Sequence, residues 1–337
     1  MTASHVLAAL GTLSLAGLIS FALTRAIRPV LIRYLLAKPN ARSSHSIPTP
    51  QGGGFAVVGA TLIAGGLASA IIMPQTWTSL AIVFAAVAFI AAVGALDDFR
   101  SLPVAARLLC QALAIGAVLL VAPSSMRISP EIPVWIERGL LLLAGIWFVN
   151  LVNFMDGLDL MTASEAVPIT GALVLFGLTG VLPPATTLLA AALCGAMLGF
   201  APFNRPIANI FLGDVGSLPI GLLLGWMLLD LAYQHQLAAA LILPLYYLAD
   251  ATTTLIRRAM NREPVWQAHR SHFYQRATDN GFSVTRVVTN VFCTNIVLAG
   301  LAGVSAYFRS GLVDIIALVA ATALVTTLMV RFSTPQR

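Results

Sequence analysis

Residues 78–98 read TSLAIVFAAVAFIAAVGALDD, an apolar stretch that ends in two adjacent aspartates, Asp97 and Asp98. A helix that crosses a bilayer needs about 20 mainly apolar residues. This stretch meets that need without one charged residue before its end. The segment therefore predicts a membrane-spanning helix that carries two carboxylates where it leaves the hydrocarbon.

The composition of the whole chain agrees with this stretch. Of its 337 residues, 58% are hydrophobic and only 9% are charged, whereas soluble proteins carry about 25% charged residues. These values exclude both a soluble globular domain and a disordered chain. Three cysteines are too few for a disulfide scaffold of this size. Because all three lie in apolar runs, we expect them to be small core residues: Cys110, Cys194 and Cys293.

We predict one all-α domain over residues 1–337, a polytopic membrane bundle of about eleven spanning helices. No linker, composition shift or repeat divides the chain. The first span is not a cleaved signal peptide, because basic residues follow it rather than precede it. The predicted spans are 5–24, 53–73, 78–96, 106–122, 139–153, 166–182, 185–201, 215–234, 237–256, 285–307 and 312–330.

The basic residues predict the orientation of this bundle. If the N-terminus is periplasmic, all 19 Lys and Arg residues except Arg127, Arg138 and Arg309 fall in loops on one side. That asymmetry marks the crowded side as cytoplasmic and places the C-terminus there too. The net charge of +6 is then chiefly a topology signal and not a sign of nucleic-acid binding, although anionic lipid headgroups could also use it.

Carboxylates that are distant in the sequence converge on this cytoplasmic face. Ionisable residues in or beside a membrane span are costly and are therefore functional candidates. Hard oxygen ligands from two or three acids, with asparagine, water and substrate phosphates, suit Mg²⁺. The acids are Asp97, Asp98, Asp156, Asp159, Asp214 and Asp250.

Structural roles for some of these acids remain open alternatives. Asp214 could simply cap the helix that follows it, and Asp159 could be a turn residue after Gly157. The aspartate pair at 97–98 stands at a helix C-terminus, where the dipole disfavours anions, so a cation is its natural neighbour. We expect Asp230 and Asp314 to be interfacial on the outer side.

The longest internal loop, 257–284, contains the run HRSHFYQR at 269–276. Histidines three residues apart could bind zinc, but no cysteine or HExxH pattern accompanies them. Arginine grips phosphate oxygens in a bidentate manner, so anionic oxygens are the better match for Arg270 and Arg276. A solvated positive loop is the alternative, above all for Arg257 and Arg258.

Two further segments carry polar chemistry. The loop NARSSHSIPTPQGGG at 40–54 contains Arg42, His45 and three glycines that would allow a ligand to approach the backbone closely. Its glycines are not a dinucleotide fingerprint, because no βαβ context exists in this chain. Near 103 a helix begins in which Arg107 shares a face with Gln111. That arginine could hold a lipid phosphate or could only snorkel.

Four blocks occur in order along the chain: DDFRSLP (97–103), NLVNFMDGLD (150–159), PFNRPIANIFLGDVGSLPIG (202–221) and AHRSHFYQR (268–276). With RSSHSIPTPQGGG at 42–54, they resemble the polyprenyl-phosphate N-acetylhexosamine-1-phosphate transferases, bacterial glycosyltransferase family 4. The HRSHFYQR form is similar to the branch that initiates O-antigen or other surface-polysaccharide synthesis. The phospho-muramoyl-pentapeptide transferase branch typically has a run of histidines there.

The resemblance implies a reaction in which a UDP-N-acetyl sugar gives its sugar 1-phosphate to undecaprenyl phosphate and UMP is released. It also implies a requirement for Mg²⁺, with Mn²⁺ as a substitute. Asp214 would be the principal metal ligand, with Asn153 nearby. Asp97 and Asp98 would deprotonate or orient the lipid phosphate, and Asp97 is the preferred base. A one-step transfer and a covalent two-step route both remain open.

The resemblance also implies the site residues, with Asp156 in the cleft and Asp159 at the nucleoside. The expected active-site loops are about 40–54, 97–106, 153–165, 202–216 and 257–284. Leu160 departs from the family, which usually has a glycine at this position. The expected catalytic residues are Asp97, Asp98, Asp156, Asp214, His269 and His272. The expected substrate-binding residues are Arg42, His45, Arg107, Asn153, Asp159, Asn204, Arg270 and Arg276.

Two other functions fit the residues less well. A transporter or flippase would place charges near the bilayer midplane, whereas the acids here gather at one surface. A catalytically inactive scaffold finds support only in Leu160. The expected partners are the UDP-sugar, undecaprenyl phosphate and membrane lipids, with a homodimer compatible with the sequence. The donor sugar and the pathway cannot be predicted from the residues.

Overall fold

The computed structural model describes residues 3–37, 48–264, 267 and 269–336. Its elements, in chain order, are α1 (Ala3–Tyr34), β1 (Leu36–Ala37), β2 (Thr49–Pro50), α2 (Gly54–Ile72), the 3₁₀ turn η1 (Pro74–Thr76), α3 (Trp77–Phe99), α4 (Val104–Val121), α5 (Val134–Met155), α6 (Met161–Leu178), α7 (Pro184–Phe200), the 3₁₀ turn η2 (Ala201–Phe203), α8 (Asp214–Tyr233), α9 (Leu237–Ile242), α10 (Leu245–Met260), α11 (Phe273–Asp279), α12 (Val284–Phe308) and α13 (Gly311–Ser333).

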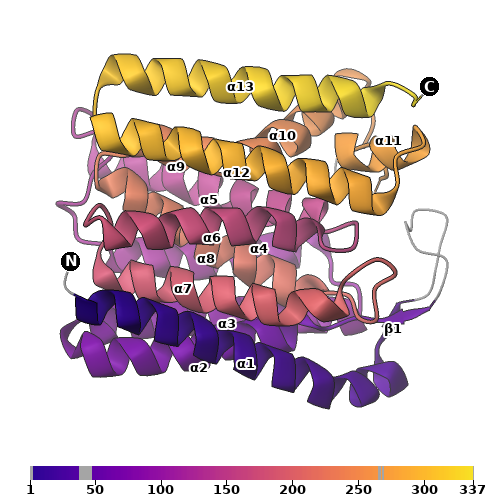
Figure 1. The fold of residues 1–337 in the computed structure, drawn as a ribbon, viewed down its shortest axis with the longest axis horizontal. Helices are drawn as coiled ribbons and strands as arrows, with labels where there is room; N and C mark the ends of the chain where they lie inside the picture. Colours follow the sequence, from indigo (N-terminus) through magenta and orange to yellow (C-terminus); the bar gives the residue numbers. More distant parts are fainter. Residues whose placement is uncertain (1–2, 38–47, 265–266, 268, 337) are drawn as a thin grey trace.

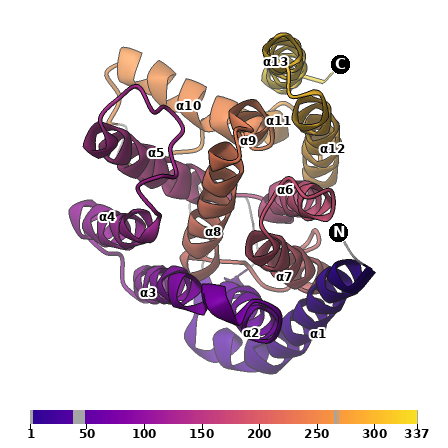
Figure 2. The same cartoon turned by 90° about the vertical axis from the view of Figure 1, so that its left-hand side faces the viewer.

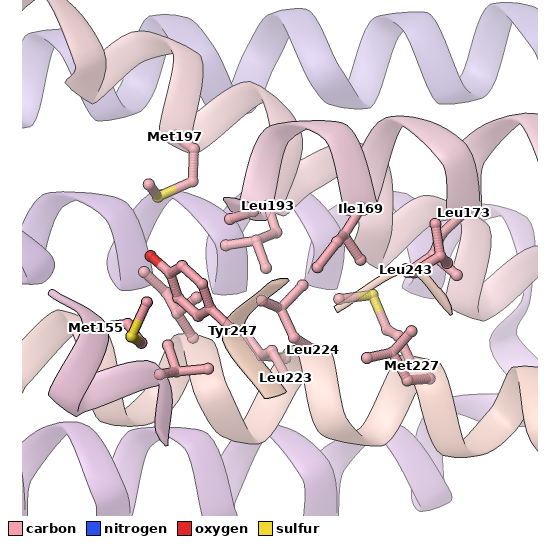
Figure 3. Packing of buried hydrophobic residues seen from close by; sticks show 14 of the residues in the cluster. Met155, Ile169, Leu173, Leu193, Met197, Leu223, Leu224, Met227, Leu243 and Tyr247 are labelled. Carbon is pink, nitrogen blue, oxygen red and sulfur yellow. The ribbon is translucent and has the colours of Figure 1, made fainter. Parts of the chain in front are cut away.

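The long helices run side by side, and α8 lies at the centre of the bundle (Figures 1 and 2). Helix α8 packs against α2, α3, α5 and α9. Apolar side chains from several helices fill the interior around it, among them Met155, Leu193, Leu223 and Tyr247 (Figure 3). This arrangement confirms the predicted all-α membrane bundle.

Within the described ranges, ten helices are long and apolar enough to cross a membrane. The predicted span 237–256 is not one continuous helix. It is divided into α9 and α10 around Leu243 and Pro244. Proline has no N–H to donate and its ring clashes with the preceding turn, so it ends a helix. The segment 237–256 is therefore as apolar as a membrane span, but it is not a single continuous helix.

Asp230, near the end of α8, is 9% exposed and accepts a hydrogen bond from Thr186. The expectation that the three cysteines are core residues was wrong for two of them. Cys194 is buried as expected, whereas Cys293 is exposed on the outside of the bundle and Cys110 is intermediate. Because lipid tails are as apolar as a protein core, an apolar run does not tell the inner face of a helix from its outer face.

The polar chemistry lies at one end of the bundle. Helix α11 and strand β1 lie at that end (Figure 1). Strands β1 and β2 pair in antiparallel fashion, and Gln51 continues from β2 into a parallel bridge with Phe211. This pairing ties the start of α2 to the loop that precedes α8.

Candidate active site

Helices α3 and α8 approach each other closely at Gly94. A Cβ atom on Gly94 would lie 2.3 Å from the carbonyl oxygen of Asp214, so only glycine permits this approach. The contact brings the Asp98 carboxylate to the start of α8. There it accepts hydrogen bonds from the N–H groups of Asp214 at 3.0 Å and of Val215 at 3.1 Å. Asp98 therefore caps α8 from another helix and satisfies two amides that a helix N-terminus leaves free.

Asp97 has different partners. Its carboxylate accepts hydrogen bonds from Arg107 Nη1 and from the Leu102 N–H, both at 2.6 Å. Arg107 Nη1 also lies 4.0 Å from Asp214 Oδ2, so this arginine is an ion-pair partner within the site. Both carboxylates at the end of α3, Asp97 and Asp98, therefore have hydrogen-bond donors from the protein itself. An ion-paired carboxylate is a weak proton acceptor, which disfavours Asp97 as the base.

The two expected metal ligands lie together. Asn153 Nδ2 donates to Asp214 Oδ1 at 2.7 Å and to Ser217 Oγ at 2.9 Å. Within the described ranges, no group of three or more His, Cys, Asp or Glu side chains is arranged to hold a metal ion. The pair offers one carboxylate and one amide, a donor set that suits Mg²⁺, which usually keeps several waters and binds substrate phosphates.

One cavity of about 390 Å³ brings together much of the predicted site. It receives residues from the ends of α3 and α5, from the start of α8, and from the loops around them. Gln51 and Gln275, which the sequence reasoning missed, also line it. The lining residues within the described ranges include no Lys or Arg, so the cavity is acidic. Its predicted members are Asp98, Asn153, Asp156, Asp159, Asn204 and Asp214.

Asp156 directly follows α5 and accepts a hydrogen bond from Thr162 in the first turn of α6. Burial, with a smaller contribution from the negative charges of Asp98 and Asp159, raises the pKa of Asp156 to about 7. A carboxyl group that titrates near neutral pH is suited to accept a proton during catalysis. Asp156 is therefore a better candidate base than the ion-paired Asp97.

The loop after Asp156 is fastened to the loop that precedes α8. Asp159 Oδ2 accepts from the Ala208 N–H at 3.0 Å, and Asn204 Oδ1 accepts from the Leu160 N–H at 2.7 Å. Leu160 has a φ of 62°, a left-handed conformation that costs a non-glycine residue about 1–2 kcal/mol. The usual family glycine would adopt this conformation without strain.

Gln275 of the HRSHFYQR run lines the cavity, whereas the other residues of the run lie beside it. His272 is 2% exposed, and its Nδ1 lies 3.1 Å from Asp250 Oδ1. Arg270 forms an ion pair with Asp279 at 3.1 Å. The guanidinium group of Arg276 and the ring of His269 also pack against protein side chains, Phe273 and His272 respectively. The run thus forms a wall next to the cavity, while its contact with substrate stays a prediction.

A second set of positioning contacts was missed by the sequence reasoning. The Tyr274 hydroxyl donates to the carbonyl oxygen of Phe154 at 3.0 Å. A Cβ on Gly157 would lie 2.1 Å from that hydroxyl oxygen. Gly157 therefore allows Tyr274 to approach closely, but the sequence does not show which residue approaches it. Arg42 and His45 lie outside the described residues.

Residues 80–232 match the model of Glycosyl transferase family 4. The chain is 28% identical over 262 residues to a probable undecaprenyl-phosphate N-acetylglucosaminyl 1-phosphate transferase of Bacillus subtilis, covering 73% of this chain and 70% of the relative.

Two other relatives extend the comparison. A decaprenyl-phosphate N-acetylglucosaminephosphotransferase of Mycobacterium tuberculosis is 26% identical over 344 residues, covering 87% of this chain and 81% of that protein. A phospho-N-acetylmuramoyl-pentapeptide-transferase of Enterococcus faecalis is 28% identical over 272 residues, with coverage of 72% and 81% respectively. With its many apolar helices, the chain is a multi-pass protein of the bacterial inner membrane. The family match and these relatives support a place for the chain among the polyprenyl-phosphate N-acetylhexosamine-1-phosphate transferases of glycosyl transferase family 4.

Proposed function

We propose that this protein transfers an N-acetylhexosamine 1-phosphate from a UDP-sugar to undecaprenyl phosphate at the cytoplasmic face of the membrane and releases UMP. The observation that carries the proposal is an acidic cavity beside an apolar one. Among the described residues, the apolar cavity, of about 240 Å³, is lined by apolar side chains and glycines of α4, α5, α8, α9 and α10 and of the segments beside them. Val149 of that cavity lies one helical turn from Asn153 of the acidic cavity.

The two cavities match the two parts of the proposed acceptor. A polyprenyl chain is apolar, and burial of apolar surface is favourable, so the apolar cavity is suited to the part of the chain nearest the headgroup. The phosphate would then stand at the ends of α3, α5 and α8, where Asp98, Asp156 and Asp214 lie. A soluble sugar acceptor has no apolar chain that could bind in the apolar cavity.

The proposed reaction exchanges one phosphate bond for another. An oxygen of the lipid phosphate attacks the phosphorus that bears the sugar, and the bond from that phosphorus to the UMP oxygen breaks. Because two anions must meet, charge neutralisation and alignment dominate such catalysis. Mg²⁺ or Mn²⁺, when held by Asp214 with Asn153, would supply positive charge to the nucleotide phosphates.

The chain's own residues have separate tasks in this proposal. Asp156 accepts the last proton of the lipid phosphate, since its pKa of about 7 is close to working pH. Asp98 fixes the first turn of α8 and so places Asp214. Asp159 and Asn204 hold the two loops that wall the donor side of the cavity.

The HRSHFYQR run supports a role in starting O-antigen or other envelope-polysaccharide synthesis. The similarity to the Enterococcus faecalis pentapeptide transferase keeps a peptidoglycan step as the second candidate. The two candidates differ in the donor, because a pentapeptide-bearing sugar is far larger than a plain N-acetylhexosamine.

A donor panel tests the proposal. Purified protein in nanodiscs is incubated with undecaprenyl phosphate, Mg²⁺ and one of several UDP-N-acetylhexosamines or UDP-N-acetylmuramoyl-pentapeptide, and UMP release is measured. We expect release with at least one plain N-acetylhexosamine donor, its loss in EDTA and its return with Mn²⁺. Release with the pentapeptide donor alone would support the second candidate. No release with any donor would refute the proposed function.

A further inference from the structure

We infer that Asp250 is a positioning residue of the transferase: it fixes the tautomer and orientation of His272 and anchors the HRSHFYQR run beside the cavity. Asp250 lies in α10, outside the cavity. Its effect on catalysis rests on the proposed function. Its effect on the histidine rests only on the hydrogen bonds that Asp250 makes with the start of α11.

The Asp250 carboxylate is fully buried, at 0% exposure. Oδ1 lies 3.1 Å from His272 Nδ1 and accepts from the Phe273 N–H at 3.0 Å. Oδ2 accepts from the Tyr274 N–H at 3.1 Å. A buried carboxylate is tolerated only with such partners. All three lie at the start of α11, so one side chain on α10 holds the beginning of that short helix.

The contact with Asp250 determines the histidine tautomer. A carboxylate only accepts hydrogen bonds, so the nitrogen facing it must carry the hydrogen. In the neutral ring the hydrogen is then on Nδ1, and Nε2 keeps its lone pair. Among the described side chains, the hydrogen-bond partner of this ring through Nδ1 is Asp250, and no side-chain partner is recorded at Nε2. This nitrogen is therefore left to act as an acceptor or, when the ring is protonated, as a donor to an anionic oxygen.

Neighbouring rings fix the direction of this imidazole. Phe154 stacks on it with ring centroids 6.4 Å apart, and Tyr274 does so at 5.8 Å. His269 lies closer, at 4.8 Å. A ring with stacked neighbours and an anchored Nδ1 cannot turn freely, so Nε2 points in one direction. This is the support that a side chain needs to be held in a productive geometry.

The anchored segment is connected to the cavity. Tyr274, held by Asp250 at its N–H, donates its hydroxyl to the Phe154 carbonyl, two residues before Asp156. The next residue, Gln275, lines the cavity itself. Loss of the Asp250 carboxylate would thus loosen His272 and one wall of the site together.

The kinetic test is Asp250→Asn. The asparagine amide has an NH₂ group in place of one carboxylate oxygen. At least one of the three groups that donate to Asp250 then faces another donor and loses its hydrogen bond. We expect kcat for UMP release to fall at least about 10-fold, the lower end of losses seen when a carboxylate that orients a histidine is replaced, with KM for the donor changed less than about 2-fold. A kcat within 2-fold of wild type would overturn the inference.

Two matched controls separate positioning from simple burial. The Tyr246 hydroxyl and the Thr254 Oγ1 also donate to the Asp250 carboxylate, each at 3.3 Å, and these hydrogen bonds do not involve His272. Tyr246→Phe and Thr254→Val remove hydrogen bonds from the same carboxylate and leave the histidine anchored. We expect both to keep kcat within about 2-fold of wild type. A loss in all three variants that follows their thermal stability would show that Asp250 is only structural.

A spectroscopic readout is independent of activity. The chain has only five histidines, so ¹⁵N labelling of histidine gives few signals, and His272→Gln identifies the one of interest. We expect the Nδ1–H tautomer at His272 in wild type and its loss in Asp250→Ala, which leaves no acceptor opposite Nδ1. An Nε2–H tautomer in wild type, or an unchanged signal in the variant, would overturn the inference. This result stands even if the donor panel shows no transfer.

A double mutant completes the test. If Asp250 acts through His272, Asp250→Asn combined with His272→Gln should be no slower than His272→Gln alone, since coupled residues are not additive. Losses that multiply would show that Asp250 acts by another route. Thermal unfolding of each variant confirms that the compared proteins are folded.

Discussion

Charged side chains have different partners at the two ends of the bundle. At the end opposite α11, Glu137 accepts from Arg127 Nε at 2.7 Å and from the Ile128 N–H at 2.9 Å. In the same region Arg138 donates to the Tyr233 hydroxyl at 2.9 Å. Arg127 and Glu137 thus neutralise each other, and Arg138 is hydrogen-bonded to uncharged groups at the ends of the helices.

At the α11 end, four carboxylates line one cavity whose described walls contain no Lys or Arg. Arg107 pairs with Asp97, which lies outside that cavity, at 2.6 Å and is 4.0 Å from Asp214 within it. Paired charges at the first end thus stabilise the fold, whereas the excess of carboxylates at the second end requires cationic or protonated ligands.

Asp214→Asn should give the largest loss. It removes the carboxylate that the proposal assigns to the metal, and we expect UMP release to fall by roughly 10³-fold, as for loss of a principal electrostatic group. Asp230→Asn is the matched control, because it neutralises a buried carboxylate that lies in the same helix but accepts from Thr186 and lines neither described cavity. It should retain activity within about 2-fold. Equal activity of Asp214→Asn and wild type would refute the proposed metal site.

Asp156→Asn should lower kcat by roughly 100-fold, the lower end of a general base contribution. In wild type, kcat/KM should fall up to about tenfold per unit as pH drops below about 7, because the raised pKa of Asp156 keeps its carboxyl protonated there. The variant should lack this dependence. The same pH profile in both proteins would exclude Asp156 as the base.

The raised pKa of Asp156 also predicts a stability effect with a definite sign. The folded protein holds this proton more tightly than the unfolded chain, so the ionised carboxyl lowers stability as pH rises from the ordinary value of 3.8 to about 7. Asp156→Asn removes that loss. Its Tm relative to wild type, measured in EDTA, should therefore be higher at pH 8 than at pH 5. A pH-independent difference would contradict the burial of this group.

Asp98 should show a graded effect. Its two carboxylate oxygens each cap one amide of α8, so asparagine can replace one bond and alanine neither. We expect thermal stability to fall in the order Asp, Asn, Ala, with about 1 kcal/mol for the full loss of the cap, and activity to fall about 10-fold as Asp214 loosens. Inactive Asp98→Asn with unchanged stability would show that the charge acts directly on substrate.

The smallest effect is expected at Leu160. Leu160→Gly and Leu160→Ala remove the same packing, but only glycine relieves the left-handed conformation at φ 62°. Glycine should be more stable than alanine by about 1 kcal/mol in chemical denaturation in detergent. Equal stabilities would show that the backbone there is not strained.

The sequence predicts well what depends on composition and chain order. Apolar runs predicted the spanning helices, and acids at their ends predicted a common site, because a helix of known length determines where its ends lie. It missed what depends on contacts between distant segments. Asp98 and Val215 are 117 residues apart in sequence, and no spacing rule connects them. The break at Pro244 was missed because apolar composition continues through it.

The cap on α8 has a consequence for how substrates must bind. A free helix N-terminus attracts phosphate through its unsatisfied amides. Here the Asp98 carboxylate already occupies the N–H groups of Asp214 and Val215, so this helix has no anion-binding end to offer. Nucleotide affinity should then be weak for the bare protein and should depend steeply on free divalent cation. In a cell, cation supply would therefore set donor occupancy as directly as the donor concentration does.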